Sequence, residues 1–272
     1  MANILDRIVA HKKLEVERRR EQSPVQRLQQ SDGYQLPRRS LCTSIEQSKH
    51  FGIIAEFKRK SPSQSDINLE ADATAVARGY AEAGAAAISC LTDANFFGAR
   101  PDDIDRVRAA VDLPIIRKDF IIDPYQVYEA RAMGADAILL IAGCLSAQQV
   151  DELAELADEL GLQSICEVHN EEEAAKISPS VDIIGVNNRD LTDFSVDTVR
   201  SLELQSVLPP SILRISESGI EDPQTIVKLR KEGFRGFLIG TYFMRQADPG
   251  LACADFIKKT HEIDNIYKDA IA

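Results

Sequence analysis

Four segments of this chain repeat one local pattern, in which a helical stretch ends at a glycine and a buried strand follows. Gly suits the left-handed conformation that ends a helix before a short turn. The four glycines stand at positions 84, 134, 161 and 233, so they are separated by 50, 27 and 72 residues. These separations are close to two, one and three units of about 25 residues, the length of one strand–helix unit with short loops. The pattern therefore predicts a regular succession of such units.

Eight apolar segments are interpreted as buried strands. We expect strands at 53–57, 86–91, 114–117, 136–141, 164–167, 183–186, 212–216 and 236–239. We expect helices between and after them at 72–83, 101–110, 124–133, 146–160, 170–177, 196–202, 223–231 and 249–260, four of which begin with a proline that suits a first turn. Near-continuous apolar strands that alternate with helices indicate a parallel sheet covered on both faces.

Eight such units in 272 residues predict an α/β fold, a (β/α)8 (TIM) barrel. The alternative is a doubly wound open sheet, which is disfavoured because the chain has no Gly-rich G-x-G-x-x-G turn.

The first 50 residues do not follow this strand–helix repeat. Residues 3–21 carry apolar side chains at helical spacing, and a polar connection rich in Ser and Gln follows over 22–40. We expect a single barrel domain over 1–272, made of a helical extension and connection (1–50) and the barrel itself (51–262). The extension is interpreted as a packing appendage, and the alternative is that it covers one end of the barrel.

The composition narrows the classes of function. A net charge of -11 argues against general nucleic-acid binding, so cations gathered at one place suggest a small anionic ligand. No apolar run approaches the ~20 residues of a membrane span, and no secretory signal is visible. The five Cys show no C-x-x-C spacing, which indicates neither a zinc site nor a disulfide framework and favours the reducing cytoplasm.

The first expected strand carries an acid and a base at its carboxyl end. Side chains alternate across a strand, so Glu56 and Lys58 share a face with Ile54, while Ala55 and Phe57 share the other. Buried Glu and Lys are rare without a partner or a task. The pattern therefore indicates a functional site, with a structural ion pair as the alternative.

Polar side chains close the other expected strands, at the barrel end where active sites form. They are Lys118 after the third strand, Glu167 after the fifth, Asn187 and Arg189 after the sixth, and Glu217 after the seventh. We expect three carboxylates, two lysines and an arginine to converge there. The alternative, a ring of structural salt bridges, would not need the glycines and hydroxyls that close strands seven and eight.

Those glycines and hydroxyls suggest a phosphate site. The pairs Ser218-Gly219 and Gly240-Thr241 offer backbone N–H groups, hydroxyls and room for close approach, and barrels often hold a phosphate between these two loops. Ser61 and Lys60, after the adjoining first strand, could reach the same anion. His169 is interpreted as a loop or cap residue, and the acidic run after it suits a first helical turn.

Six motifs together closely resemble the signature of indole-3-glycerol phosphate synthase, a family of tryptophan biosynthesis. They are IAEFKRKSPS (54–63), KDF (118–120), EVH (167–169), NNRDL (187–191), SESGI (216–220) and LIG (238–240), and the resemblance spans residue 1 to about 260. It implies a lyase that converts 1-(2-carboxyphenylamino)-1-deoxyribulose 5-phosphate into indole-3-glycerol phosphate, releasing carbon dioxide and water. It also implies that neither a metal nor an organic cofactor is needed.

The resemblance assigns roles to residues. It makes Lys118 the general acid of ring closure, Glu167 an acid/base in the loss of water, and Lys58 the partner of the substrate carboxylate, with Glu56 and Glu217 holding the lysines charged. Substrate-binding roles fall on Asn187, Arg189, Ser218, Phe97 and Leu191. Phosphate-binding roles fall on Ser61, Lys60, Gly219, Gly240 and Thr241.

Two other functions remain open. One is a Schiff-base aldolase with Lys118 or Lys58 as nucleophile, which needs a lysine of depressed pKa and is disfavoured by the neighbouring glutamates. The other is a non-catalytic phosphate-binding barrel. The expected partner is a small sugar-phosphate substrate, with neither nucleic acid nor membrane. We expect a cytoplasmic monomer that could associate with other enzymes of the tryptophan pathway.

Overall fold

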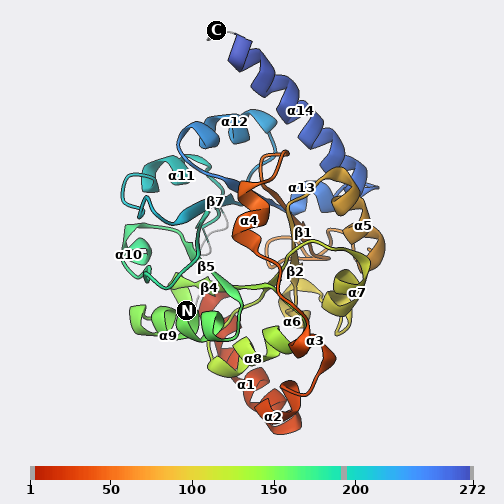
Figure 1. Ribbon diagram of the computed structural model, residues 1–272, viewed down its shortest axis with the longest axis vertical. Helices are drawn as coiled ribbons and strands as arrows, with labels where there is room; N and C mark the ends of the chain where they lie inside the picture. The colour runs from red at the N-terminus through yellow and green to blue at the C-terminus, as the bar shows by residue number, and fades with distance from the viewer. Residues whose placement is uncertain (1–3, 191–194, 270–272) are drawn as a thin grey trace.

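The computed structural model describes residues 4–190 and 195–269, and its centre is a closed barrel of eight parallel strands in chain order (Figure 1). Each strand pairs with its neighbours in sequence, and the first pairs with the last. The strands are β1 (Ile53–Phe57), β2 (Ala87–Leu91), β3 (Ile115–Lys118), β4 (Ala137–Ile141), β5 (Gln163–Val168), β6 (Ile183–Asn187), β7 (Leu213–Glu217) and β8 (Gly236–Ile239). The predicted (β/α)8 barrel is confirmed.

The helices that follow the strands surround the barrel (Figure 1). They are α5 (Ala73–Ala83), α6 (Ala94–Phe97), α7 (Asp103–Ala110), α8 (Pro124–Ala132), the 3₁₀ turn η1 (Ala142–Cys144), α9 (Ala147–Glu159), α10 (Glu171–Ala174), α11 (Val199–Leu204), α12 (Pro223–Lys231), α13 (Thr241–Met244) and α14 (Pro249–Asp269). The four glycines that predicted the strand–helix units all have positive φ.

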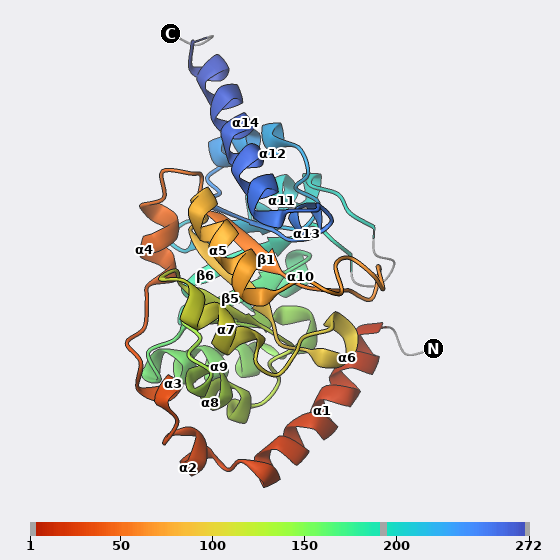
Figure 2. The same ribbon diagram turned by 90° about the vertical axis from the view of Figure 1, so that its right-hand side faces the viewer.

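Three helices differ from their predicted bounds by three residues or more, and α7 starts two residues late. The first, α10 (Glu171–Ala174), ends three residues before the predicted end at 177. The second, α11, starts after Val196, because that residue is extended and forms an isolated bridge with Arg189. The third, α14, continues nine residues beyond 260, since neither Gly nor Pro interrupts it. Its last turns project from the barrel (Figure 2). Pro101 lies two residues before α7, outside its first turn.

Two apolar layers follow from the alternation of side chains along the strands. Ile54, Ile116, Ile165 and Ile215 belong to the cluster inside the barrel. Ala55 and its outward-facing counterparts belong to a larger cluster between the strands and the helices. Because each inward isoleucine precedes a polar residue by two positions, the same alternation carries the polar side chains to the inside of the carboxyl end.

The N-terminal segment passes around the barrel from one end to the other (Figure 2). It contains α1 (Ile4–Gln22), α2 (Val25–Leu28), α3 (Asp32–Gln35) and α4 (Leu41–Glu46), and α1 and α4 lie on opposite sides of the sheet. At the amino end of the strands, Leu41 and Ile45 of α4 extend the inner apolar cluster. The Leu41 N–H donates to Oε1 of Gln163 on β5 at 2.5 Å, which fixes α4 there.

At the carboxyl end, α1 contributes its apolar side chains to the wall of a cavity. Ile4, Leu5 and Ile8 all line it. Interpreting the extension as a packing appendage was therefore wrong, and the alternative holds: the helix covers one end of the barrel. The physical reason is that the open end presents apolar wall residues that the apolar side of α1 can cover.

A buried ion cluster anchors α1 in that position. The Lys12 ammonium is fully buried and lies 2.8 Å from a carboxylate oxygen of each of Glu15, Asp93 and Asp119. Burial alone would lower the pKa of Lys12, but Asp119 and Asp93 outweigh it and raise the pKa above its ordinary value. Lys12 therefore stays charged and ties α1 to the ends of β2 and β3.

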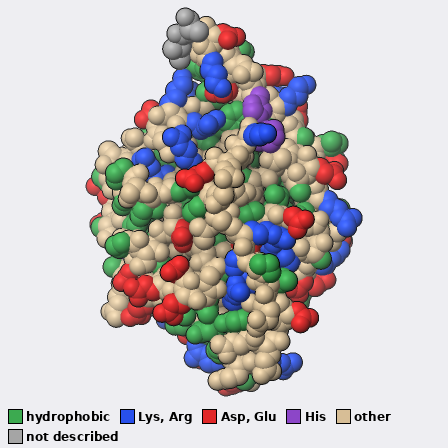
Figure 3. All heavy atoms as spheres, in the orientation of Figure 1, with side chains coloured by type: hydrophobic (Ala, Val, Ile, Leu, Met, Phe, Trp, Pro, Cys, Tyr) green, Lys and Arg blue, Asp and Glu red, His purple; other side chains and the backbone are tan. Residues whose placement is uncertain are grey.

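The surface has two further properties. Acidic and basic side chains are interspersed over the face that carries α4 (Figure 3). Within the described part of the chain, no helix has both the length and the apolar character needed to cross a bilayer.

Candidate active site

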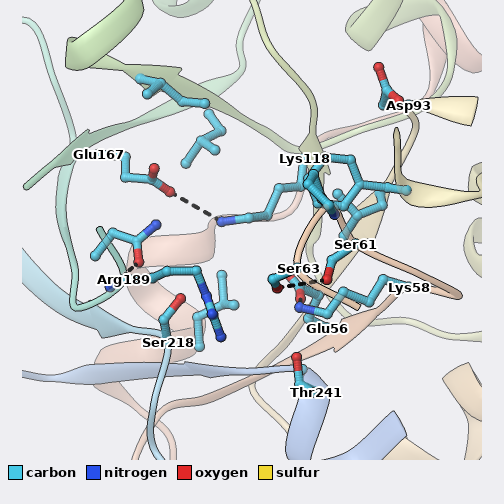
Figure 4. A pocket seen from close by; sticks show the side chains of 18 of the residues that line it. Glu56, Lys58, Ser61, Ser63, Asp93, Lys118, Glu167, Arg189, Ser218 and Thr241 are labelled. Atoms are coloured by element: carbon cyan, nitrogen blue, oxygen red, sulfur yellow. Dashed lines mark hydrogen bonds and ion pairs between the residues drawn. The ribbon is translucent and has the colours of Figure 1, made fainter. Parts of the chain in front are cut away.

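The cavity lies at the carboxyl end of the barrel and has an empty volume of about 1160 Å³, the open mouth included. Its apolar wall includes Leu91, Phe120, Leu139 and Leu238. Most residues that the sequence predicted for the site line it: Glu56, Lys58, Ser61, Phe97, Lys118, Glu167, Asn187, Arg189, Ser218, Gly219, Gly240 and Thr241. Figure 4 shows how the labelled side chains converge from different strands and loops.

Lys118 lies between two buried glutamates. Its Nζ is 2.7 Å from Oε2 of Glu217 and 3.3 Å from Oε2 of Glu167. Burial opposes the charge on the ammonium, but Glu217, Glu167 and Glu56 outweigh this effect and raise the pKa of Lys118 above its ordinary value. A lysine held charged in this way is a proton donor and not the neutral amine that a Schiff base requires.

The two glutamates differ in their protonation. Burial would raise the pKa of Glu167, but Lys118, His169 and a hydrogen bond from Asn187 lower it overall, so this carboxylate stays ionised. Burial raises the pKa of Glu217 to about 7, in spite of Lys118 and with the help of the negative charges of Glu167 and Glu56. Oε1 of Glu217 also accepts no hydrogen bond from the described residues. The site thus pairs one glutamate that stays ionised with one that can hold a proton near neutral pH.

A second acid–base pair stands across the cavity. Nζ of Lys58 lies 2.5 Å from Oε1 of Glu56, and both side chains are mostly buried. Gly240 makes room for this pair, because a Cβ at that position would lie 2.2 Å from Oε1 of Glu56. Gly185 on β6 does the same for Glu217, whose Oε1 would also lie 2.2 Å from an added Cβ. The absence of a side chain at these two glycines therefore leaves the space that the carboxylates of Glu56 and Glu217 occupy.

The three cations of the first-strand motif, Lys58, Arg59 and Lys60, have different partners, and only Lys58 lines the cavity. Lys58 faces the cavity, whereas Arg59 points outward and forms a buried ion pair with both carboxylate oxygens of Asp103 at 2.5 and 2.8 Å. Lys60, which was predicted to bind phosphate, does not line the cavity: its Nζ donates to the backbone oxygen of Asn95 at 2.7 Å. The alternation of side chains past the strand end turns Arg59 away, and the contact with Asn95 holds Lys60 aside.

The loop after β7 presents its backbone to the cavity in an unusual conformation. Ser218 and Gly219 are consecutive left-handed residues, with φ of 67° and 73°. For a non-glycine residue this conformation is uncommon and concentrates at functional sites. The side-chain amide of Asn188 donates to the Ser218 carbonyl and to the Ser216 hydroxyl, both at 3.0 Å, and so holds the loop.

The remaining predicted residues are found as follows. Ser61 stands in a tight turn closed by reciprocal backbone hydrogen bonds with Gln64, and its hydroxyl lies 3.2 Å from that of Ser63. Phe97 packs near Phe120, with 6.1 Å between ring centroids. Leu191 lies outside the described residues.

Two features of the site were missed by sequence reasoning. The apolar side of α1 lines the cavity, and no residue type in 3–21 distinguishes a cavity wall from an ordinary core contact. His169 lies in the loop after β5, as expected, but its mostly buried side chain stands directly behind Glu167, and this contact was not predicted; the residue that caps α10 is Asn170. The E-V-H motif could have indicated this contact, because residue 169 directly follows the end of β5 and stands two positions after Glu167, the spacing that brings side chains to the same side of an extended chain.

Comparison with known proteins agrees with this geometry. The family model described as "Indole-3-glycerol phosphate synthase" matches residues 5–256. The chain belongs to the indole-3-glycerol phosphate synthase family. A family member from Bacteroides thetaiotaomicron is 45% identical over 258 residues, which cover 95% of this chain and 99% of the relative. A member from Salinibacter ruber is 44% identical over 254 residues, with 92% and 93% covered.

Solved structures resemble the chain in fold. The α subunit of tryptophan synthase from Legionella pneumophila superposes with a TM-score of 0.57 at 14% identity, covering 83% of this chain and 98% of that chain. Thiamine phosphate pyrophosphorylase from Pyrococcus furiosus gives the same TM-score at 18% identity, covering 79% and 98%. At such low sequence identity, these two structures show that the fold is similar and carry no information on function. The match to the synthase family rests on the sequence.

Proposed function

We propose that this chain is a carboxy-lyase that converts 1-(2-carboxyphenylamino)-1-deoxyribulose 5-phosphate into indole-3-glycerol phosphate, releasing carbon dioxide and water. The observation that carries the proposal is the charged Lys118 between Glu167 and Glu217, facing the Lys58–Glu56 pair across one cavity. Two cations and an ionised base within reach of one small molecule suit a substrate that carries a carboxylate and a phosphate.

Ring closure is the first step that these residues would assist. As the aromatic carbon attacks the sugar carbonyl, negative charge develops on the carbonyl oxygen. An alkoxide is more basic than a lysine amine, so Lys118 can donate a proton to it even with a raised pKa. Lys58 would pair with the substrate carboxylate and orient it for the loss of carbon dioxide.

Loss of water is the second step and requires both an acid and a base. Glu167 suits the base, because Lys118 and His169 keep its pKa low and the carboxylate ionised. Asn187 and Arg189, at the end of β6, would hold the anthranilate ring and the sugar hydroxyls, and Phe97 would pack on the ring. Groups of this kind typically contribute ~10²–10⁴-fold each, so several must act together.

The phosphate of the substrate would lie between the loops after β7 and β8. Ser61, Gly219, Gly240 and Thr241 line this part of the cavity and offer hydroxyl and backbone N–H donors. Lys60 would contribute only if its ammonium left the carbonyl of Asn95. We further propose that the enzyme works in the cytoplasm as a single-domain monomer, with association with other tryptophan-pathway enzymes as an additional possibility to test.

The test is turnover of this substrate, followed by the appearance of indole fluorescence. We expect Lys118→Ala and Glu167→Gln to lower kcat by about 10²–10⁴-fold each, while both variants still bind the sugar phosphate. Near-normal turnover in both variants would overturn the assigned roles. A covalent adduct on borohydride reduction with a sugar phosphate would favour the aldolase instead.

A further inference from the structure

His169 stands behind Glu167, on the side away from Lys118. Its Nε2 lies 3.5 Å from Oε1 of Glu167, the oxygen that Lys118 does not contact. Its Nδ1 lies 2.8 Å from Oε2 of Glu173, which also accepts the backbone N–H of His169. The side chain is only 9% exposed. The imidazole is thus held between two carboxylates in a buried position.

This placement determines which protonation state suits the ring. If Nδ1 donates to Glu173 and the ring is neutral, the lone pair on Nε2 faces a carboxylate oxygen, which is repulsive. A proton on Nε2 removes the repulsion and directs an N–H toward Glu167. No described residue makes a hydrogen bond to Nε2 at present, so the contact with Glu167 is the one this nitrogen can complete.

The surroundings favour the charged ring. Burial lowers the pKa of His169, but the hydrogen bond with Glu173 and the charges of Glu167 and Glu173 raise it overall, against a smaller opposing effect of Arg200 on α11. Cys144, on η1, is a neutral thiol here because burial raises its pKa to about 12. The Lys176 ammonium is engaged by the carbonyls of Ala142 and Leu145 at 2.8 and 3.1 Å.

We propose that His169 is a positioning residue, held as an imidazolium by Glu173, which orients Glu167 and keeps it ionised for its role as a base. Lys118 neutralises one oxygen of Glu167 and His169 the other. When Lys118 turns to the substrate oxygen, His169 remains as the fixed cation behind the base. The proposal rests on the proposed function of the cavity, and it goes beyond the roles assigned there.

The test compares two substitutions at this position. His169→Asn can keep the bond to Glu173 but cannot reach Glu167, whereas His169→Gln can place an uncharged N–H near Glu167. We expect His169→Asn to lower kcat by about 10- to 100-fold, the loss of one hydrogen bond to a charged group, with KM changing far less. The acidic limb of the kcat profile should move to higher pH, because Glu167 loses a cation that lowers its pKa.

His169→Gln should recover part of kcat without returning the acidic limb to its original pH. Glu173→Gln should shift the limb in the same direction, and its effect should not add to that of His169→Asn, because the two residues act as a unit. His261→Asn is the matched control: its ring contacts His50 beside α14, where histidines are visible in Figure 3, and its loss should leave the profile unchanged. An unshifted acidic limb in His169→Asn overturns the proposal.

A second measurement does not depend on turnover. The chain has four histidines, so their ring C–H resonances can be assigned by substitution and titrated by NMR. His169 should remain protonated to higher pH than His261, whose pKa is lowered by burial and by His50, and Glu173→Gln should lower the titration midpoint of His169. If the wild type fails to make the indole product but this midpoint behaves as expected, the proposed function is wrong, whereas the protonated state inferred for His169 is supported. If the titration midpoint of His169 is that of an unperturbed histidine, the proposed role of His169 is wrong, whether or not the enzyme makes the product.

Discussion

Replacing Glu217 by Gln should stabilise the protein at alkaline pH while it weakens catalysis. The Glu217 side chain is 1% exposed, and its surroundings raise its pKa to about 7 from the ordinary 4.5. A carboxyl group with a raised folded-state pKa contributes stability that is fully present below the unfolded-state pKa. This contribution is lost as the pH rises through the folded-state pKa.

The magnitude follows from the two pKa values. Their difference, 7 − 4.5 = 2.5, at 1.36 kcal/mol per pH unit, corresponds to a loss on the order of 3 kcal/mol at pH 8.5. At pH 5 the same linkage gives a loss of about 1 kcal/mol. Glutamine resembles the neutral carboxyl group, so Glu217→Gln should escape this loss. It should also release Lys118 from its closest partner and lower kcat, a trade of activity for stability that is common at active sites.

Urea denaturation of the wild type and Glu217→Gln at pH 8.5 and pH 5 would measure the difference. We expect the variant to have the larger free energy of unfolding at pH 8.5 and a much smaller advantage at pH 5. Glu203→Gln, at an exposed position on α11, is the matched control and should show no such dependence on pH. A variant that is less stable than the wild type at pH 8.5, or a difference that does not change with pH, would refute the reasoning.

Two other substitutions test the supports of the site. Lys12→Met should cost about 3–5 kcal/mol of unfolding free energy in urea, because it removes the cation that pairs with the buried Asp93 and leaves the buried Asp119 with Arg117 alone. Lys13→Met, at the exposed neighbouring position, should cost far less, and equal losses would contradict the anchoring of α1. Gly240→Ala should lower kcat/KM by at least about tenfold, because its Cβ would displace the Glu56 carboxylate and with it Lys58. An unchanged kcat/KM would show that the pair tolerates displacement.

The sequence predicted the barrel and most of the site because both follow from local alternation. An inward isoleucine two positions before a polar residue indicates that the polar side chain also faces inward, as Ile116 does for Lys118 and Ile165 does for Glu167, both of which line the cavity. The glycines at the helix ends also revealed the repeat in the sequence. All four have the positive φ that a glycine at the end of a helix commonly adopts.

What the sequence left undetermined depends on contacts between distant segments. In the sequence, Lys12 cannot be distinguished from the other charged residues of its helix. The structure shows that Asp93 and Asp119, which follow the ends of β2 and β3, contact its ammonium group. Lys60 follows the same strand end as Lys58, yet the carbonyl of Asn95 in another loop decides where its ammonium lies. Strand alternation fixes which face a side chain occupies, but it does not extend into the loops, where partners far apart in sequence decide orientation.

The path of the N-terminal segment has a consequence for how the molecule assembles during translation. Residues 4–46 leave the ribosome before the barrel strands exist, yet Lys12 needs Asp93 and Asp119, and Leu41 needs Gln163 on the fifth strand. We therefore expect α1 to dock only after β3 has emerged and α4 only after β5 has begun to emerge, although both helices are synthesised first. Until these strands have emerged, the apolar sides of α1 and α4 remain exposed to water, and to any chaperone that recognises such surfaces.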